Sequence, residues 1–386
     1  MSNSPKKVIA KIFSDIADGI ETGSFGQRPQ IAITGLGSEH GEKEVFDAAL
    51  EAARRGNAVT YIGTMKDELL TTVDAVDAED AHHKMDELLD AGKVDGAVTM
   101  HYPFPIGVST VGRIITPAKG KELFIACTTG TSSTDRVEAM IKNAVAGIIT
   151  AKACGIKHPT VGILNVDGAR KTEEALKELK AGGYEIEFAE SSRADGGCVM
   201  RGNDLLAASC DIMVTDSLTG NILVKTLSAY STGGSYEAVG FGYGPGIGKG
   251  YDKLVLIISR ASGAPVIANA IGFGSQLIAN DYRKIAAEEF AAAEKAGLDA
   301  ILKKNKASNK AAAAEEKTVP QPPKEVVTHA FAGIEVMDLD DAVHKLWESG
   351  IYAESGMGCT GPVVLVSEAN ADKSEEILKK GGWIGA

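Results

Sequence analysis

One cysteine stands in a setting suited to covalent chemistry. Cys359 lies between Gly358 and the pair Thr360 and Gly361, within the stretch ESGMGCTGP at 354–362. Glycines let the backbone turn tightly enough for several N–H groups to point one way, and such a nest stabilises a thiolate or a tetrahedral oxyanion. We therefore interpret Cys359 as an acyl-carrying nucleophile, with its neighbours as the oxyanion loop. The alternative is a small buried residue at a turn, because free cysteine is often buried.

A second stretch has the composition of an anion site. Residues 216–226 read DSLTGNILVKT and follow a short apolar run. Backbone N–H groups at the start of a helix bind anions, Lys225 adds a positive charge, and Asn221 adds amide donors. We predict that these two residues, with Thr219 and Gly220, bind phosphate or an acyl group. The alternative is a capped helix with a solvated lysine.

A hydroxyl-rich loop is the third candidate. Residues 128–135 read TTGTSSTD, directly after another apolar run. A helix cap at the end of this loop accounts for one side chain and leaves the other hydroxyls unexplained. We predict that Thr129, Thr131 and Ser132 contribute to the same phosphate or acyl site.

The remaining cysteines and histidines are weaker candidates. Cys127 stands directly before the hydroxyl-rich loop, where a ligand could reach it, and is our second candidate nucleophile. His40 and His101 each follow an apolar run and could act as acid or base, although a structural use is the favoured interpretation. His82 and His83 lie in an acidic, helix-like stretch and are expected to be solvated.

The sequence offers no pattern typical of a metal or nucleotide site. Its five cysteines include no C-x-x-C pair, and no histidine–carboxylate set has metal-ligand spacing. Residues 240–250 read GFGYGPGIGKG, which lacks the spacing of phosphate-binding glycine loops. We interpret this glycine ladder as a flexible flap or a backbone contact surface. We expect no metal and no cofactor, with phosphate as a substrate.

The candidate residues follow short apolar runs that alternate with helical patterns such as that at 136–154. Strands are predicted at 31–34, 58–62, 96–100, 122–126, 160–164, 212–215, 254–258 and 265–268. Strands that alternate with helices imply right-handed crossovers and a mostly parallel sheet. We therefore predict a doubly wound α/β fold of mostly parallel strands, whose ligands bind beyond the carboxyl ends of the strands.

The composition changes near residue 303. Residues 303–325 read KKNKASNKAAAAEEKTVPQPPKE, which offers almost nothing to bury, and we predict a linker there. It divides an α/β domain at 1–302 from a C-terminal module at 326–386 that carries Cys359. In this small α/β module we expect strands at 333–337 and 362–367 and helices at 338–349 and 371–380.

Composition and charge limit the classes of partner. The 386 residues carry a formal net charge of −12 and no basic run of useful length, which argues against nucleic acid and against an anionic membrane surface. The start of the chain has the spacing of an amphipathic helix interrupted by acidic residues, and no long apolar stretch is typical of a membrane span. We expect a cytoplasmic protein.

Several of these segments resemble a known family. Residues 161–165, 211–226 and 263–267 look like successive motifs of the phosphate acyltransferases of fatty-acid and phospholipid synthesis, over about residues 30–285. Ser217 departs from that pattern, since the family often has glycine there. The resemblance implies the α/β fold predicted above and acyl transfer to phosphate, and it leaves the linker and the C-terminal module unexplained.

The whole arrangement, including GMGCTGP at 356–362, is similar to the family of alpha subunits of component C of glycine/sarcosine/betaine reductase complexes. That resemblance implies a role in amino-acid fermentation. It implies that a carboxymethyl group on selenoprotein A is released as an acetyl thioester on component C, and that phosphate then yields acetyl phosphate. It also implies a condensing-enzyme-like component C beta subunit as partner, in a homo- or hetero-oligomer.

Our prediction is acetyl transfer from a Cys359 thioester to phosphate. One alternative is a stand-alone phosphate acyltransferase that uses acyl-CoA or an acyl carrier protein. A second alternative is a non-catalytic scaffold subunit that docks a catalytic partner. Formation of acyl phosphate by the isolated chain would exclude the scaffold, and acceptance of long acyl chains would favour the stand-alone enzyme.

Overall fold

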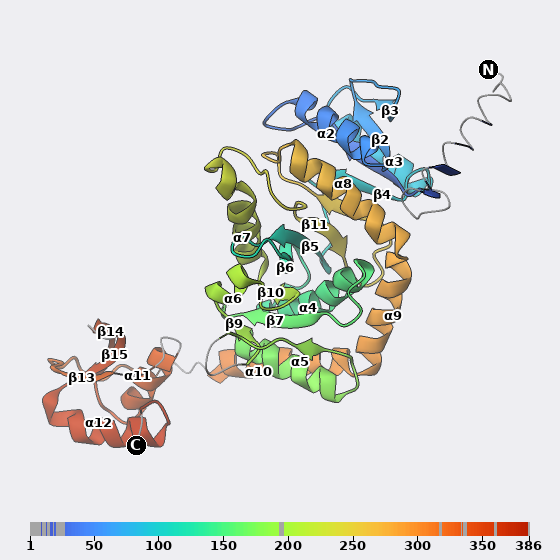
Figure 1. Cartoon of the computed structure of the whole chain (residues 1–386). Helices are drawn as coiled ribbons and strands as arrows, with labels where there is room; N and C mark the ends of the chain where they lie inside the picture. The colour runs from blue at the N-terminus through green and yellow to red at the C-terminus, as the bar shows by residue number, and fades with distance from the viewer. Residues whose placement is uncertain are drawn as a thin grey trace. The chain divides into compact units, whose positions relative to one another are not determined.

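A computed structural model describes residues 28–192, 197–315, 319–332, 334, 338–358 and 361–384, together with positions 9, 13, 16, 17, 19 and 20 (Figure 1). The chain divides into two compact units, residues 1–306 and 307–386. The described N-terminal positions are helical, and Ile9, Phe13, Ile16 and Ile20 are exposed. No helix in the described part of the chain combines the length and the apolar character that a membrane crossing needs.

The first unit is built on one twelve-stranded sheet. Its strands are β1 (Gln30–Thr34), β2 (Ala58–Gly63), β3 (Thr71–Asp74), β4 (Gly96–Thr99), β5 (Val108–Ile115), β6 (Glu122–Thr131), β7 (Thr160–Leu164), β8 (Glu187–Phe188), β9 (Val199–Met200), β10 (Ile212–Val214), β11 (Gly244–Ile247) and β12 (Val255–Ile257). Their order is β3-β2-β1-β4-β12-β11-β5-β6-β10-β7-β8, and β9 also pairs with β7.

The sheet consists of two parallel halves joined by antiparallel strands. Strands β3, β2, β1, β4 and β12 are parallel, as are β6, β10, β7, β8 and β9. Between them, β11 is antiparallel to both β12 and β5, and β5 is antiparallel to β6. Because three antiparallel pairings lie between β12 and β6, the strands of the two halves run in opposite directions. The carboxyl ends of the two halves therefore lie at opposite ends of the strands. The prediction of a mostly parallel sheet is confirmed.

Helices pack against both faces of this sheet (Figure 1). They are α2 (Glu42–Arg54), α3 (Ala78–Asp90), α4 (Arg136–Ala153), α5 (Ala169–Ala181), α6 (Gly202–Ala207), α7 (Ser217–Ala229), α8 (Ala264–Ala279), α9 (Tyr282–Lys295) and α10 (Leu298–Glu315). Successive side chains of a strand point to opposite faces. In β6, Phe124 belongs to the core cluster that contains α4, whereas Leu123 and Ile125 belong to the cluster that contains Val224 of α7. The doubly wound α/β class is therefore confirmed.

One expectation about this sheet is wrong, and the structure decides between the two alternatives of another. Residues 265–268 form the first turns of α8 rather than a strand, because Pro265 starts the helix and its apolar run continues to Ala279. The glycine ladder is a backbone contact surface rather than a flexible flap, and its residues 244–247 form the buried strand β11. A Cβ on Gly244 would meet the carbonyl oxygen of Val111 at 1.8 Å, so glycine here permits close approach of two strands.

The second unit has its own sheet and core. It contains β13 (His329–Ala332), α11 (Leu339–Glu348), β14 (Ala353–Gly358), β15 (Gly361–Val366) and α12 (Ala371–Lys380), with the antiparallel order β13-β15-β14. Val364 and Val366 pack with Leu346 of α11 and Leu378 of α12. The second strand and both helices agree with the predicted ranges, whereas the first strand ends at Ala332. Residues 333 and 335–337 lie outside the described residues.

The predicted linker at 303–325 spans different local structures. Helix α10 continues through its first part to Glu315. At its other end, Glu325 accepts hydrogen bonds from Ser367 (2.6 Å) and Asn370 (3.1 Å) of the second unit. Residues 316–318 lie outside the described residues. That 303–325 acts as a linker stays a prediction.

Candidate active site

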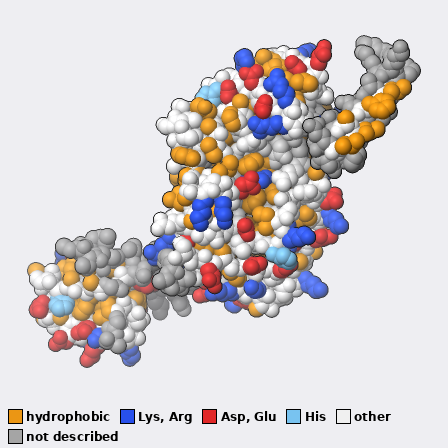
Figure 2. Space-filling model, viewed as in Figure 1, with side chains coloured by type: hydrophobic (Ala, Val, Ile, Leu, Met, Phe, Trp, Pro, Cys, Tyr) orange, Lys and Arg blue, Asp and Glu red, His pale blue; other side chains and the backbone are white. Residues whose placement is uncertain are grey.

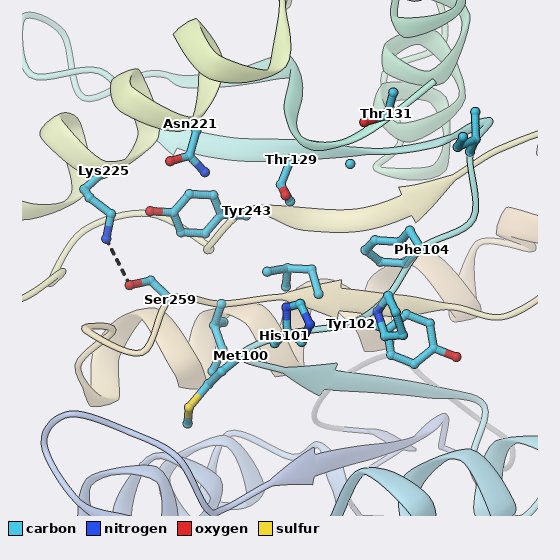
Figure 3. A pocket seen from close by; sticks show the side chains of 15 residues that line it. Met100, His101, Tyr102, Phe104, Thr129, Thr131, Asn221, Lys225, Tyr243 and Ser259 are labelled. Atoms are coloured by element: carbon cyan, nitrogen blue, oxygen red, sulfur yellow. Dashed lines mark hydrogen bonds between the residues drawn. The ribbon is translucent and has the colours of Figure 1, made fainter. Parts of the chain in front are cut away.

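A cavity of about 430 Å³ in the first unit collects side chains from both halves of the sheet (Figure 3). Its polar groups come from the segment after β4, the end of β6, helix α7, the residue before β11 and the segment after β12. They are His101, Tyr102, Thr129, Thr131, Asn221, Lys225, Tyr243 and Ser259. Four of the predicted phosphate- and acyl-binding residues, Thr129, Thr131, Asn221 and Lys225, thus line one cavity.

Lys225 is held by a buried carboxylate. Its Nζ lies 3.1 Å from Glu237 Oε1 and 3.2 Å from Ser259 Oγ. The Glu237 side chain is 1% exposed and also accepts hydrogen bonds from the Tyr243 hydroxyl and Ser262 Oγ, both at 2.9 Å. Burial and the Glu237 charge raise the pKa of Tyr243, so this phenol remains a donor. The alternative interpretation holds in part, because Asp216 caps α7 and the Lys225 side chain is half exposed, while its ammonium group pairs with Glu237.

Thr219 and Gly220 position α7 rather than line the cavity. Asp216 caps the helix by accepting hydrogen bonds from Thr219 N (3.0 Å) and Thr219 Oγ1 (2.7 Å). A Cβ on Gly220 would lie 1.8 Å from the carbonyl oxygen of Cys127, so glycine lets the helix approach the end of β6. The next residue, Asn221, donates from Nδ2 to the carbonyl oxygen of Thr128 (3.1 Å). These contacts fix the first turns of α7, and Asn221 with them, against the end of β6.

Ser132 lines a smaller adjoining cavity of about 220 Å³, which shares Gly130 and Thr131 with the first. The Ser132 hydroxyl is buried and donates to Asn143 Oδ1 (2.7 Å). Asn143 in turn donates to the carbonyl oxygen of Thr215 (3.1 Å), so Ser132 fastens the loop to the sheet. Arg136 also lines this cavity and was missed, although it is the first residue of the predicted helix 136–154.

The four described cysteines are poor nucleophiles. Cys127 is 1% exposed, its thiol donates to the carbonyl oxygen of Thr129 (2.9 Å), and burial raises its pKa to about 12. Burial likewise raises the pKa of Cys154 and Cys210 to about 12 and that of Cys198 to about 11. These thiols therefore stay protonated at neutral pH.

Cys359 and Thr360, the predicted nucleophile and a member of its oxyanion loop, lie outside the described residues. On either side of them, Gly358 ends β14 and Gly361 begins β15, and these two glycines pair across the antiparallel strands.

The histidines divide into bonded and free rings. His82 Nε2 lies 2.7 Å from Thr99 Oγ1, and burial, together with the nearby His101, lowers the pKa of His82. The prediction that His82 is solvated is therefore wrong, because α3 turns this residue onto the end of β4. His101 lines the main cavity. The described residues contain no cluster of three or more His, Cys, Asp and Glu side chains suited to a metal ion.

Side chains in this cavity supply what an anionic substrate needs. Lys225 offers charge, and Asn221, the hydroxyls of Thr129 and Thr131 and the ring of His101 offer hydrogen-bonding groups. Acidic and basic side chains are interspersed over the visible face of this unit (Figure 2).

The chain is similar to a subunit of a reductase complex and, over part of its length, to phosphate acyltransferases. Residues 29–365 match the model of the family described as fatty acid synthesis protein. The chain is 57% identical over 381 residues to the glycine/sarcosine/betaine reductase complex component C subunit alpha of Peptoclostridium acidaminophilum, covering 98% of this chain and 99% of that one. It is 26% identical over 245 residues to a phosphate acyltransferase of Geobacillus sp. (strain WCH70), covering 51% and 70%. A solved branched-chain phosphotransacylase from Enterococcus faecalis V583 is 16% identical, with a TM-score of 0.45 and coverage of 65% and 99%.

Proposed function

Because this chain belongs to the fatty acid synthesis protein family, and within it to the alpha subunits of component C of glycine/sarcosine/betaine reductase complexes, we propose that it transfers an acetyl group from a Cys359 thioester to phosphate. In this step a phosphate oxygen attacks the thioester carbonyl carbon and forms a C–O bond. The C–S bond then breaks, and its electron pair goes to sulfur. The products are acetyl phosphate and the free thiol.

The observation that carries this proposal is the convergence of Lys225, Asn221, Thr129 and Thr131 on one cavity. Phosphate bound there would take a charge-assisted hydrogen bond from Lys225 and neutral hydrogen bonds from the amide and the hydroxyls. Charge-assisted hydrogen bonds are worth about 1.5–3 kcal/mol. Glu237 and Ser259 orient the ammonium group before the substrate arrives, which reduces the cost of ordering it.

The choice of Cys359 rests on its neighbours and on the state of the other thiols. The four described cysteines have pKa values raised to about 11–12 by burial, so none supplies a thiolate at neutral pH. Cys359 stands among glycines, and paired Gly358 and Gly361 flank the two residues between β14 and β15. A thioester at sulfur splits the overall transfer into two easier steps.

We infer the particular partners from the sequence resemblance, because the relative's name gives only membership in a complex. That protein is named as a subunit of a reductase complex. By membership in the same family, we expect a component C beta subunit as the partner of this chain and selenoprotein A as the source of the acetyl group.

Intact-mass measurement of the purified chain tests the thioester. After incubation with acetyl phosphate, the chain should gain one acetyl group, which neutral hydroxylamine should remove. Cys359→Ala should fold normally and gain none, whereas the matched variant Cys154→Ala should behave as the wild type does. An adduct that persists in Cys359→Ala would move the acyl carrier to another side chain, and an absent adduct in the wild type would contradict the proposal.

A stand-alone phosphate acyltransferase is the second candidate function, favoured by the 26% identity to the Geobacillus enzyme. This candidate predicts that the isolated chain forms acyl phosphate from acyl-CoA or from an acyl carrier protein without Cys359. Assaying the Cys359→Ala variant with acetyl-CoA and with long-chain acyl-CoA separates the two functions. A chain that is inactive in every assay would favour the scaffold alternative.

A further inference from the structure

We propose that a second cavity of the first unit binds an organic monoanion with an apolar tail, of the class of the medium-chain carboxylates. This cavity has a volume of about 350 Å³ and is lined by residues of β5, β6, α4, β11, α9 and α10 and of the segments next to β5, β6 and β11. Small-molecule sites in proteins typically have volumes of about 300–1,000 Å³. Neither Lys225 nor Asn221 lines this cavity, so it is a site distinct from the candidate active site.

Much of the cavity wall is apolar. Two apolar side chains come from α10 and one each from α4, β11 and α9, namely Leu298, Leu302, Ala146, Ile247 and Phe290. Phe290 and Leu302 are only partly buried, although they pack against the core of the sheet. An apolar ligand that covers these side chains removes them from water, and the gain in free energy grows with the area that is buried.

Two buried serines on the same wall offer no hydrogen bond to an anion. The hydroxyl of Ser109 donates to Asn143 Oδ1 (3.0 Å), and the hydroxyl of Ser132 donates to the same oxygen (2.7 Å). A serine hydroxyl has a single hydrogen to donate, so neither has one left for a ligand. This part of the cavity therefore suits the tail of the ligand, and its charged group must bind elsewhere on the wall.

The remaining wall carries charged side chains with an excess of one positive charge. Its lysines are Lys142, Lys249, Lys303 and Lys306. Its carboxylates are Glu138, Glu294 and Asp299. Four positive and three negative charges leave a net charge of +1. That excess is matched by a ligand with a single negative charge, whereas a dianion such as phosphate would exceed it.

Two of these lysines are engaged within the protein. Lys142 Nζ lies 2.6 Å from Glu138 Oε1, and Lys249 pairs with Glu294. The two lysines of α10 form no ion pair with any residue that the structure describes. The ammonium groups of α10 are therefore the ones that can receive the charged group of a ligand.

Helix α10 brings its apolar and basic side chains to the cavity together. Leu298, Leu302 and Lys306 follow one another at intervals of four residues, and such residues lie on one face of a helix. A carboxylate bound at Lys306 and Lys303 can thus extend its tail along Leu302 and Leu298. The intervening Lys304 has another direction, because its Nζ lies 2.8 Å from Glu178 Oε2 of α5. It provides a matched control.

Calorimetric titration of the full chain with hexanoate and octanoate tests this site. Each CH₂ group that is buried strengthens binding about fourfold, so octanoate should bind about 15-fold more tightly than hexanoate. Octanol and octylammonium have the tail without the negative charge and should bind more weakly than octanoate. Lys303→Gln/Lys306→Gln should weaken octanoate binding by about three- to tenfold, because exposed ion pairs contribute modestly. Lys304→Gln should bind as the wild type does.

Two further measurements locate the ligand. Leu302→Ser should weaken octanoate binding while the urea unfolding midpoint of the chain stays close to that of the wild type. Saturating phosphate should leave octanoate binding unchanged, because the predicted phosphate site uses other residues. The proposal is overturned if the wild type shows no saturable binding, if octanol binds as tightly as octanoate, or if the double variant and Lys304→Gln bind alike. Displacement by phosphate would also overturn it, by moving the ligand to the cavity of Lys225.

Discussion

At the scale of single residues, the buried carboxylate of Glu237 orients two functional side chains at once. It receives hydrogen bonds from Lys225 and from Tyr243, and a third from Ser262 closes the network. Residues 225, 237 and 243 are close enough along the chain to meet, yet their sequence pattern did not reveal the network. Glu237 stands in an ordinary polar stretch, and only the fold of 230–243 back onto α7 buries it.

Lys225→Met should weaken phosphate binding. Losing one charge-assisted hydrogen bond costs about 1.5–3 kcal/mol. The phosphate concentration that gives half the maximal rate of acetyl phosphate formation should therefore rise on the order of ten- to a hundredfold. The single variant also leaves the Glu237 charge without its partner, so Lys225→Met/Glu237→Gln is the matched control for stability. Phosphate titration of both variants measures the effect, and an unchanged half-saturation in a folded variant would remove Lys225 from the anion site.

The cysteines should differ sharply in reactivity. Because burial raises the pKa of Cys127, Cys154, Cys198 and Cys210 to about 11–12, their thiolates form only as the pH approaches that range. At pH 7.5 iodoacetamide should therefore modify Cys359 first. Prior incubation with acetyl phosphate should protect it, and hydroxylamine should restore the reaction. Peptide mapping by mass spectrometry identifies the site, and first labelling of Cys127 would contradict this order.

At the scale of elements, the sequence predicted those strands whose own side chains form a short apolar run. Such runs identified the positions of β1, β2, β4, β6, β7, β10 and β12, and with them the last part of β6, which carries Thr129, and the segment after β4, which carries His101. It missed β3, β5, β8, β9 and β11. The residues of β11, Gly-Pro-Gly-Ile, have the composition of a turn, and this strand is buried because β12 and β5 pair on either side of it. A strand that forms because its neighbours pair with it shows no strand pattern in its own sequence.

Alanine substitutions at two glycines of the ladder separate the cost of backbone strain from the cost of a steric clash. Gly244 and Gly250 both have positive φ, +81° and +73°, which costs a non-glycine residue about 1–2 kcal/mol. A Cβ at Gly250 meets nothing within 4 Å, whereas one at Gly244 would lie 1.8 Å from the carbonyl oxygen of Val111. Gly250→Ala should lower the free energy of unfolding by about that strain alone. Gly244→Ala should lower it by much more or prevent folding.

Urea unfolding of the two glycine variants measures this difference. Equal losses would mean that β11 shifts to make room for the added methyl group, and that the centre of the sheet is not tightly packed.

At the scale of the whole molecule, two units with separate cores share one chain. The change in composition at 303–325 predicts such a division, because a stretch with few large apolar side chains contributes little to either core. The position of the first strand in the second unit was less predictable, since β13 ends at Ala332, before the expected range of 333–337. The anchoring of Glu325 by Ser367 and Asn370 also depends on contacts across more than forty residues, which composition does not reveal.

Limited proteolysis should cut first within 303–325 and release two fragments that resist further digestion. The segment at 316–325 follows the end of α10, and its residues 319–325 form neither helix nor strand, so its backbone can enter a protease site more readily than the helix before it. Trypsin digestion followed by intact-mass analysis locates the cuts. First cuts within residues 30–285, with 303–325 intact, would contradict the division.

The order of strands in the large sheet has a consequence for synthesis on the ribosome. Strand β4 pairs with β12 and β5 pairs with β11, although both partners are made long afterwards. At about 5–20 residues per second, the ribosome needs on the order of ten seconds to pass from the end of β5 to the end of β12. Before β11 and β12 are made, the strands synthesised earlier can pair only as two separate half-sheets, each with an open edge able to pair with another chain. Because the chain is made from its N-terminus, the cavity between the two half-sheets can form only after the glycine ladder has been made and has joined them.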